Sequence, residues 1–113
     1  MGNRANIQVK YQDGHDIFFY SHWDGSNVDK IVTSALSSER GKKRINDESY
    51  LARIIFCEMI KNDVLGETGY GISPYECEEG SPKCVVDMAK RLVTKSNGTE
   101  IPFNDYEGQG LIN

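Results

Sequence analysis

The sequence lacks any long apolar run. A helix needs about 20 consecutive apolar residues to span a bilayer, and the most apolar stretch, residues 50–60, is interrupted by Glu58. The N-terminus also lacks the apolar core of a signal peptide. Three cysteines are too few, and odd in number, for a disulfide framework. These absences predict a soluble cytoplasmic protein with no membrane partner.

An excess of positive charge is missing too. The net charge of −4 argues against a general nucleic-acid binder. Cys77 and Cys84 lie seven residues apart, outside the usual zinc-knuckle spacing, so we expect no metal site. The glycines of residues 66–71 (GETGYG) fit neither a P-loop nor a dinucleotide fingerprint, so we expect no cofactor. The basic segment 40–44 (RGKKR) has no flanking aromatic residue and is interpreted as a solvated loop.

What remains is the composition of an ordinary folded domain. The chain has 113 residues, of which 38% are hydrophobic and 27% charged. This length fits one domain over residues 1–113, and no internal repeat or low-complexity segment divides it.

The first 23 residues have the pattern of a β-hairpin. Ile7 and Val9 alternate with polar residues, Asp13-Gly14 suits a tight turn, and residues 16–23 (DIFFYSHW) are rich in β-formers. Which side chains of the second strand, residues 16–23, face the core depends on the length of the hairpin loop. A loop of even length places one set of side chains on the face of Ile7 and Val9, namely Phe18, Tyr20 and His22. A bulged three-residue loop places the alternate set there instead, namely Ile17, Phe19 and Trp23.

Two amphipathic helices are expected next. The first covers residues 27–39, with Ser26 as its cap and Asp29 in a capping box. The second begins at Asn46 or Asp47 and carries an apolar half wide enough to pack across a sheet. That half consists of Leu51, Ala52, Ile55, Phe56, Met59 and Ile60.

The C-terminal third is harder to interpret. Residues 70–75 read as a short strand, and Pro74 within them suggests an edge position because proline cannot donate to a neighbouring strand. Residues 83–95 fit one helix or two strands equally well. Asn97-Gly98 suits the end of that helix and a hairpin turn equally well, and the turn would pair Lys95 with Glu100. The polar, glycine-rich tail from residue 105 is expected to fray.

Four segments together resemble a known family. They are MGNRANI at the N-terminus, YSHWDG at residues 20–25, YLARIIF at residues 50–56, and TGYGIS at residues 68–73 followed by VVD at residues 85–87. They resemble a family of small uncharacterised proteins found in phages, prophages, bacteria and archaea. The family has no assigned activity, so the resemblance implies no catalytic residue. It implies strands around residues 85–87, and therefore an α+β fold of order ββααβββ. Antiparallel strands would follow the hairpin, and the helices would pack on one face of the sheet.

The best candidate binding site lies at the end of the second strand. It comprises Arg4, Tyr20, His22, Trp23 and Asp24, because the start of strand one lies beside the end of strand two in a short hairpin. Aromatic rings beside a guanidinium, an imidazole and a carboxylate can hold a nucleotide or another anion. The structural alternative is that Trp23 closes the edge of the core and that Arg4 pairs with Asp24.

These residues favour a binding protein over an enzyme. We expect a small cytoplasmic accessory protein of phage or prophage type that acts by contact with a protein or nucleotide ligand. One such role is the inhibition of a host defence system. One alternative is a small hydrolase or transferase that uses His22 with Asp24 as acid and base. Another is a structural subunit that associates with itself through an exposed sheet edge.

Overall fold

The computed structural model describes residues 3–77 and 83–106 of the chain. Its elements run in the order β1 (Ala5–Lys10), β2 (Asp16–Ser21), η1 (Gly25–Asn27), α1 (Val28–Ser37), α2 (Glu39–Lys43), α3 (Glu48–Ile60), β3 (Tyr70–Ser73), β4 (Lys83–Asp87), β5 (Leu92–Thr94) and β6 (Glu100–Pro102). The predicted α+β class with an N-terminal hairpin is confirmed. No helix in these two described ranges is long and apolar enough to cross a membrane.

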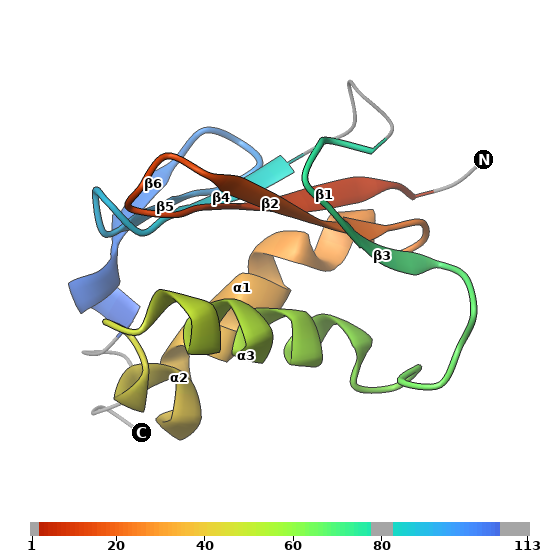
Figure 1. Cartoon of the computed structure of the whole chain (residues 1–113), viewed down its shortest axis with the longest axis horizontal. Coiled ribbons are helices and arrows are strands. Elements are labelled where there is room, and N and C mark those ends of the chain that lie inside the picture. Colours follow the sequence, from red (N-terminus) through yellow and green to blue (C-terminus); the bar gives the residue numbers. More distant parts are fainter. Residues whose placement is uncertain (1–2, 78–82, 107–113) are drawn as a thin grey trace.

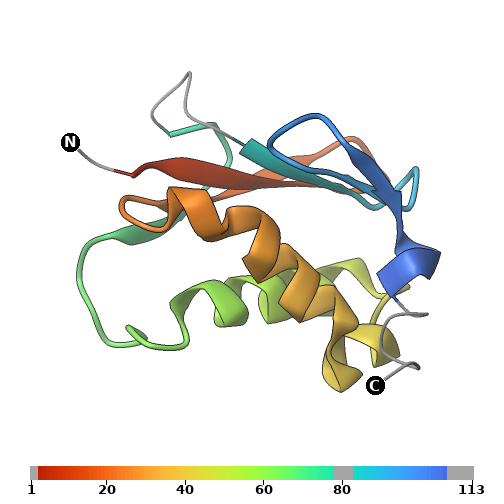
Figure 2. The same cartoon turned by 180° about the vertical axis from the view of Figure 1, so that it is seen from behind.

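The strands form one six-stranded sheet in the order β3-β2-β1-β4-β5-β6. The helices cover a single face of this sheet, as Figures 1 and 2 show from opposite sides. Four of the five strand pairs are antiparallel, as the sequence predicts for this region, but β4 lies parallel to β1. The chain must therefore cross from the outer edge of the sheet at β3 to its centre at β4.

The first hairpin resolves the question of which side chains face the core. Tyr11 N donates to His15 O at 2.8 Å, so the loop holds three residues, and Gly14 at its end has a positive φ of 93°. This is the bulged loop. It sets Ile7 opposite Phe19, so that Ile7, Val9 and Phe19 lie in the core and Ile17 packs against it, whereas Phe18 points to the opposite face.

Residues 83–95 form two strands rather than a helix. Asp87 Oδ1 accepts hydrogen bonds from the backbone N–H groups of Ala89 (3.0 Å) and Lys90 (2.9 Å), and this turn leads directly from β4 into β5. The next hairpin turns at Asn97-Gly98 as predicted, but its register differs by one residue. Glu100 pairs with Thr94, not with Lys95, because the loop again holds three residues.

Helix α3 packs across the sheet with the predicted face. Leu51, Ala52, Ile55 and Met59 are buried, and the rings of Phe56 and Phe19 approach within 5.0 Å between centroids. The helix begins after Asp47, one of the two predicted cap positions.

Two predictions about the first helix are wrong. Helix α1 begins after Asn27, and no side chain caps its N-terminus. Ser26 Oγ instead accepts a hydrogen bond from the Asn3 side chain at 3.0 Å. Asp29 does not form a capping box, because its carboxylate accepts from the N–H (2.9 Å) and the hydroxyl (2.6 Å) of Ser96. Contacts from distant loops take these side chains away from the helix end.

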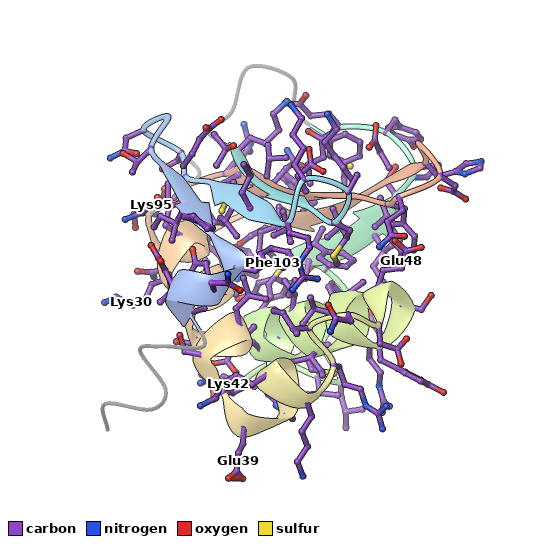
Figure 3. The ribbon with its side chains drawn as sticks, turned by 90° about the vertical axis from the view of Figure 1, so that its left-hand side faces the viewer. Lys30, Glu39, Lys42, Glu48, Lys95 and Phe103 are labelled. Carbon is purple, nitrogen blue, oxygen red and sulfur yellow. The ribbon has the colours of Figure 1, made fainter. Side chains whose placement is uncertain are left out.

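The basic segment 40–44 is not a loop. Most of it lies in the short helix α2, whose cap is Ser38: the Ser38 side chain accepts from Gly41 N at 3.0 Å. The prediction that the chain frays from residue 105 is also wrong at Tyr106, which is 1% exposed. Phe103 is buried as well, and Figure 3 shows it between the sheet and the helices. The tail beyond residue 106 lies outside the described residues.

Candidate functional site

The hairpin brings the predicted site residues to one end of the sheet. Because Ala5 pairs with Ser21, Arg4 lies beside His22 just past the last strand pair. Arg4 Nε donates to His22 Nδ1 at 3.3 Å, and the Tyr20 hydroxyl is 2.8 Å from the same nitrogen. Since the guanidinium can only donate, Nδ1 accepts from Arg4. Arg4, Tyr20 and His22 thus form one polar network.

Trp23 is held on several sides and still half exposed. Its ring meets His22 edge-on at 5.4 Å and Tyr70 edge-on at 6.3 Å between centroids. The ring also lies directly against Gly69, where a Cβ would fall 2.1 Å from Trp23 Cζ2. Even so, Trp23 is 49% exposed to solvent. The structural alternative supposed that Trp23 closes the edge of the core, and this exposure argues against it.

Asp24 is bound to a different set of partners. Its carboxylate accepts a 2.5 Å hydrogen bond from the Tyr70 hydroxyl, and its backbone N–H donates to Ser21 Oγ at 2.8 Å. Burial raises the pKa of Tyr70 to about 12, with a further contribution from the Asp24 carboxylate. The Tyr70 hydroxyl therefore stays protonated at neutral pH and remains a donor to Asp24.

The structure does not assemble the acid–base pair that a hydrolase would need. His22 bonds to Tyr20 and Arg4, whereas Asp24 bonds to Tyr70. Asp24 also lines a cavity of about 230 Å³ between α1 and α3 that His22 does not reach. Within residues 3–77 and 83–106, no group of three His, Cys, Asp or Glu side chains is placed to hold a metal ion.

Sequence reasoning missed three residues that shape this end of the sheet. Gly69 and Tyr70 come from β3 and its approach, 46 residues beyond Asp24 in the case of Tyr70. The only signal for these two residues in the sequence was the pair of glycines on both sides of Tyr70, since a glycine allows another side chain to approach the backbone closely. Asn6 is fully buried, and its amide pairs with the backbone of Cys77 through bonds of 2.7 and 3.4 Å. Nothing in the strand pattern distinguished Asn6 from an exposed polar residue.

Comparisons of the chain with protein-family models, with curated proteins and with solved structures find no match. The geometry of the site therefore carries the functional proposal.

Proposed function

We propose that the protein is a non-enzymatic accessory module that binds a partner protein through the aromatic end of its sheet. The aromatic end consists of Arg4, Tyr20, His22, Trp23 and Tyr70, with Asp24 behind Tyr70. The single observation that carries the proposal is the state of Trp23, which is fixed by its neighbours and 49% exposed. A large aromatic surface left in water gains its hydrophobic free energy only when a partner covers it.

The composition of the aromatic end suits a protein contact. Binding energy at protein interfaces concentrates in Trp, Tyr and Arg side chains, and the aromatic end contains all three. A ring that is already held by Gly69 and Tyr70 loses little conformational entropy on binding. Ile72 extends the apolar surface along the edge strand β3, where it is 56% exposed.

The resemblance to small phage and prophage proteins supports a role inside a host cell. We place the contact in the cytoplasm of a host cell, where a compact accessory protein acts by occupying the surface of a host protein. Inhibition of a host defence system is a role of this kind. The separate bonding of His22 and Asp24 favours this contact function over hydrolysis or group transfer.

Site-specific photocrosslinking near Trp23, with Trp23 itself intact, tests the proposal for any partner protein. A photoreactive residue at Ile72, which extends the same apolar surface, should give one discrete adduct in cells that produce the protein. The same residue at Lys90, an exposed position in the turn between β4 and β5, is the matched control and should give none. Equal adducts at both positions, or none at either, would refute the proposal.

The mass of the adduct separates the two kinds of protein partner. A species at twice the monomer mass of 12.7 kDa would identify a second copy of this chain and would favour the self-associating subunit. Any other mass identifies a foreign protein. In that case Trp23→Ala should abolish the adduct formed by a photoreactive residue at Ile72, and an unchanged adduct would show that Trp23 is not the anchor.

A further inference from the structure

A second candidate site lies between helices α2 and α3. It is a groove of about 430 Å³, a size typical of small-molecule sites. The α2–α3 groove is lined by Arg40, Lys43, Arg44, Tyr50, Arg53, Ile54 and Cys57. Four of these seven residues are cations, in a protein whose net charge is −4. The fold thus concentrates positive charge around one cavity.

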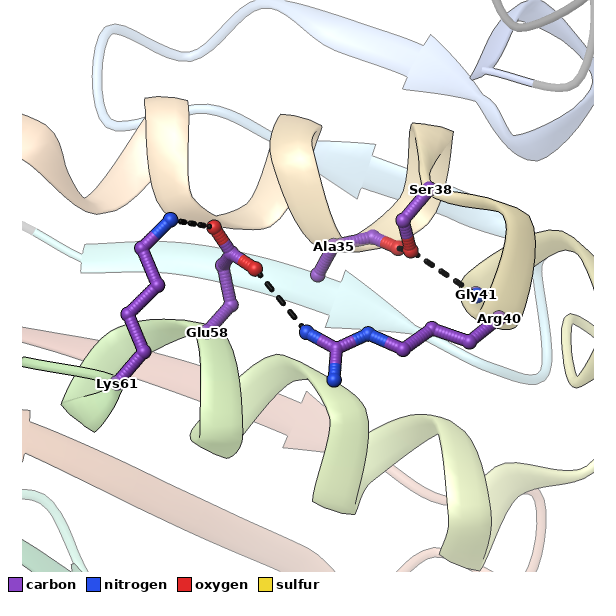
Figure 4. A network of polar contacts seen from close by, with 6 residues as sticks. All are labelled: Ala35, Ser38, Arg40, Gly41, Glu58 and Lys61. Atoms are coloured by element: carbon purple, nitrogen blue, oxygen red, sulfur yellow. Dashed lines mark hydrogen bonds and ion pairs between the residues drawn. The ribbon is translucent and has the colours of Figure 1, made fainter. Parts of the chain in front are cut away.

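Short contacts fix α2 in place beside α3 (Figure 4). Ser38 Oγ donates to the last turn of α1 at Ala35 O (2.6 Å) and accepts from Gly41 N. Gly41 packs so closely against α1 that a Cβ would lie 1.9 Å from Ala35 O. Arg40 then reaches across to Glu58 of α3 at 3.2 Å. The cations of α2 are therefore held at the groove by the packing of the helix itself.

Two of the four cations have no counter-charge among the described residues. Arg40 pairs with Glu58, and Arg44 lies 3.6 Å from Asp47. Among the ion pairs of residues 3–77 and 83–106, none includes Lys43 or Arg53. Two uncompensated cations at one cavity repel each other unless an anion lies between them. The charge pattern thus fits a ligand with more than one negative charge.

The groove also offers an aromatic surface. Tyr50 is 54% exposed, and the Arg44 guanidinium lies 5.2 Å from its ring centroid and covers one face. Ile54 adds an apolar wall beside it. A bare phosphate would use the cations but neither of these surfaces. A planar base can stack on the tyrosine–arginine pair while its phosphates bind the cations.

We infer that the α2–α3 groove binds a nucleoside polyphosphate, with the phosphates at Lys43 and Arg53 and the base at Tyr50. The single aromatic ring limits the site to one base, and the negative net charge opposes a long polyanion. This inference does not depend on the aromatic end of the sheet, which presents no comparable set of cations. The partner protein and the nucleotide occupy different sites.

Cys57 provides a direct reporter of occupancy because it lines the groove. Cys77→Ser leaves two thiols, and Cys84 is fully buried. Burial raises the pKa of the Cys84 thiol, so that it reacts slowly. In this background adenosine triphosphate should slow the labelling of Cys57 in a saturable manner, and inorganic tripolyphosphate should do so only at higher concentration. Absence of protection at millimolar adenosine triphosphate would overturn the inference.

Groove variants separate the base from the phosphates. Lys43→Ala and Arg53→Ala should each weaken adenosine triphosphate binding about tenfold, as expected for the loss of a charge-assisted hydrogen bond. Lys90→Ala removes the same charge away from the groove and should leave binding unchanged. Tyr50→Ala should weaken adenosine triphosphate binding but not tripolyphosphate binding. All four side chains are solvent-exposed, so the folded state should tolerate their removal.

Two results would assign the groove to another ligand class. If tripolyphosphate protects Cys57 as well as adenosine triphosphate does, and Tyr50→Ala affects neither, the groove binds anions without reading a base. If a single-stranded oligonucleotide of about 12 residues binds more tightly than adenosine triphosphate, and its affinity falls more steeply with salt, the ligand is a polynucleotide. Either result overturns the assignment to a nucleoside polyphosphate.

Discussion

A single methyl group at Gly69 should disturb the aromatic end of the sheet in a measurable way. Gly69 has a φ of +97°, where side chains are strained, and the Trp23 ring occupies the space that a side chain there would need. The Cβ of Gly69→Ala would fall 2.1 Å from Trp23 Cζ2, so the ring must move. Because Trp23 is the only tryptophan of the chain, its fluorescence reports on this position alone.

Two other glycines calibrate the size of the effect. Gly98 has a φ of +92°, but nothing lies within 4 Å of its Cβ position, so Gly98→Ala carries the backbone strain alone. We expect it to cost about 1 kcal/mol, after allowance for the entropy lost from the unfolded chain. Gly71 has neither strain nor a close neighbour, and Gly71→Ala should be neutral or slightly stabilising.

The cost of moving the ring follows from its burial. Trp23 is 49% exposed, so roughly 100 Å² of a side chain of this size is covered in the fold. At about 25 cal/mol per Å², the loss of this contact costs about 2.5 kcal/mol. Gly69→Ala should therefore destabilise the protein by about 3.5 kcal/mol in total, against about 1 kcal/mol for Gly98→Ala.

Urea denaturation followed by circular dichroism gives the three free energies of unfolding, and the emission spectrum gives the environment of Trp23. Gly69→Ala should shift the emission maximum to longer wavelength, whereas Gly98→Ala and Gly71→Ala should not. The reasoning is refuted if Gly69→Ala and Gly98→Ala differ by less than about 0.5 kcal/mol and share one emission maximum. In that case the Trp23 ring does not rest on Gly69 in solution.

Three further changes test other parts of the fold. Asn6→Ala should cost about 2–3 kcal/mol in urea denaturation, because both backbone partners at Cys77 lose their bonds; an unchanged midpoint would contradict this contact. Gly41→Ala should cost at least about 2 kcal/mol and reduce nucleotide protection of Cys57, because a Cβ there collides with the backbone of α1; full protection would show that α2 does not need this packing. The pKa of Tyr70 is raised from 10 to about 12 by burial, so its neutral form favours the folded state. Burial raises the pKa of Tyr106 to about 12 as well, so stability should fall between pH 10 and pH 12 through both tyrosines, and Tyr70→Phe should make that fall shallower without removing it.

Local sequence patterns were sufficient for the hairpin and for the central helix. Alternation around Ile7 and Val9 and the Asp13-Gly14 turn depend on neighbouring residues only, and so does the wide apolar half of α3. These patterns also placed Arg4 beside His22, because the pairing of a short hairpin follows from its turn. The arrangement of the first candidate site was therefore largely predictable.

Residues brought together across long separations were not predictable. The bonds of Asp29 to Ser96, of Asn6 to Cys77 and of Asp24 to Tyr70 each join segments at least 46 residues apart, and no local pattern encodes them. For this reason the capping box at Asp29 was predicted and does not form. The parallel pairing of β4 with β1 has the same origin, since it depends on a chain crossing rather than on the strand itself.

The sequence by itself determined the first hairpin and the two longer helices, because turn chemistry and apolar period act over a few residues; it left residues 83–95 open between a helix and two strands. Only the tertiary structure decided which surfaces those segments share. It turned the RGKKR segment into a short helix and packed it beside the exposed ring of Tyr50. A segment that looked like a solvated linker became one wall of a cationic groove, because the packing of Gly41 against α1 fixes where α2 lies.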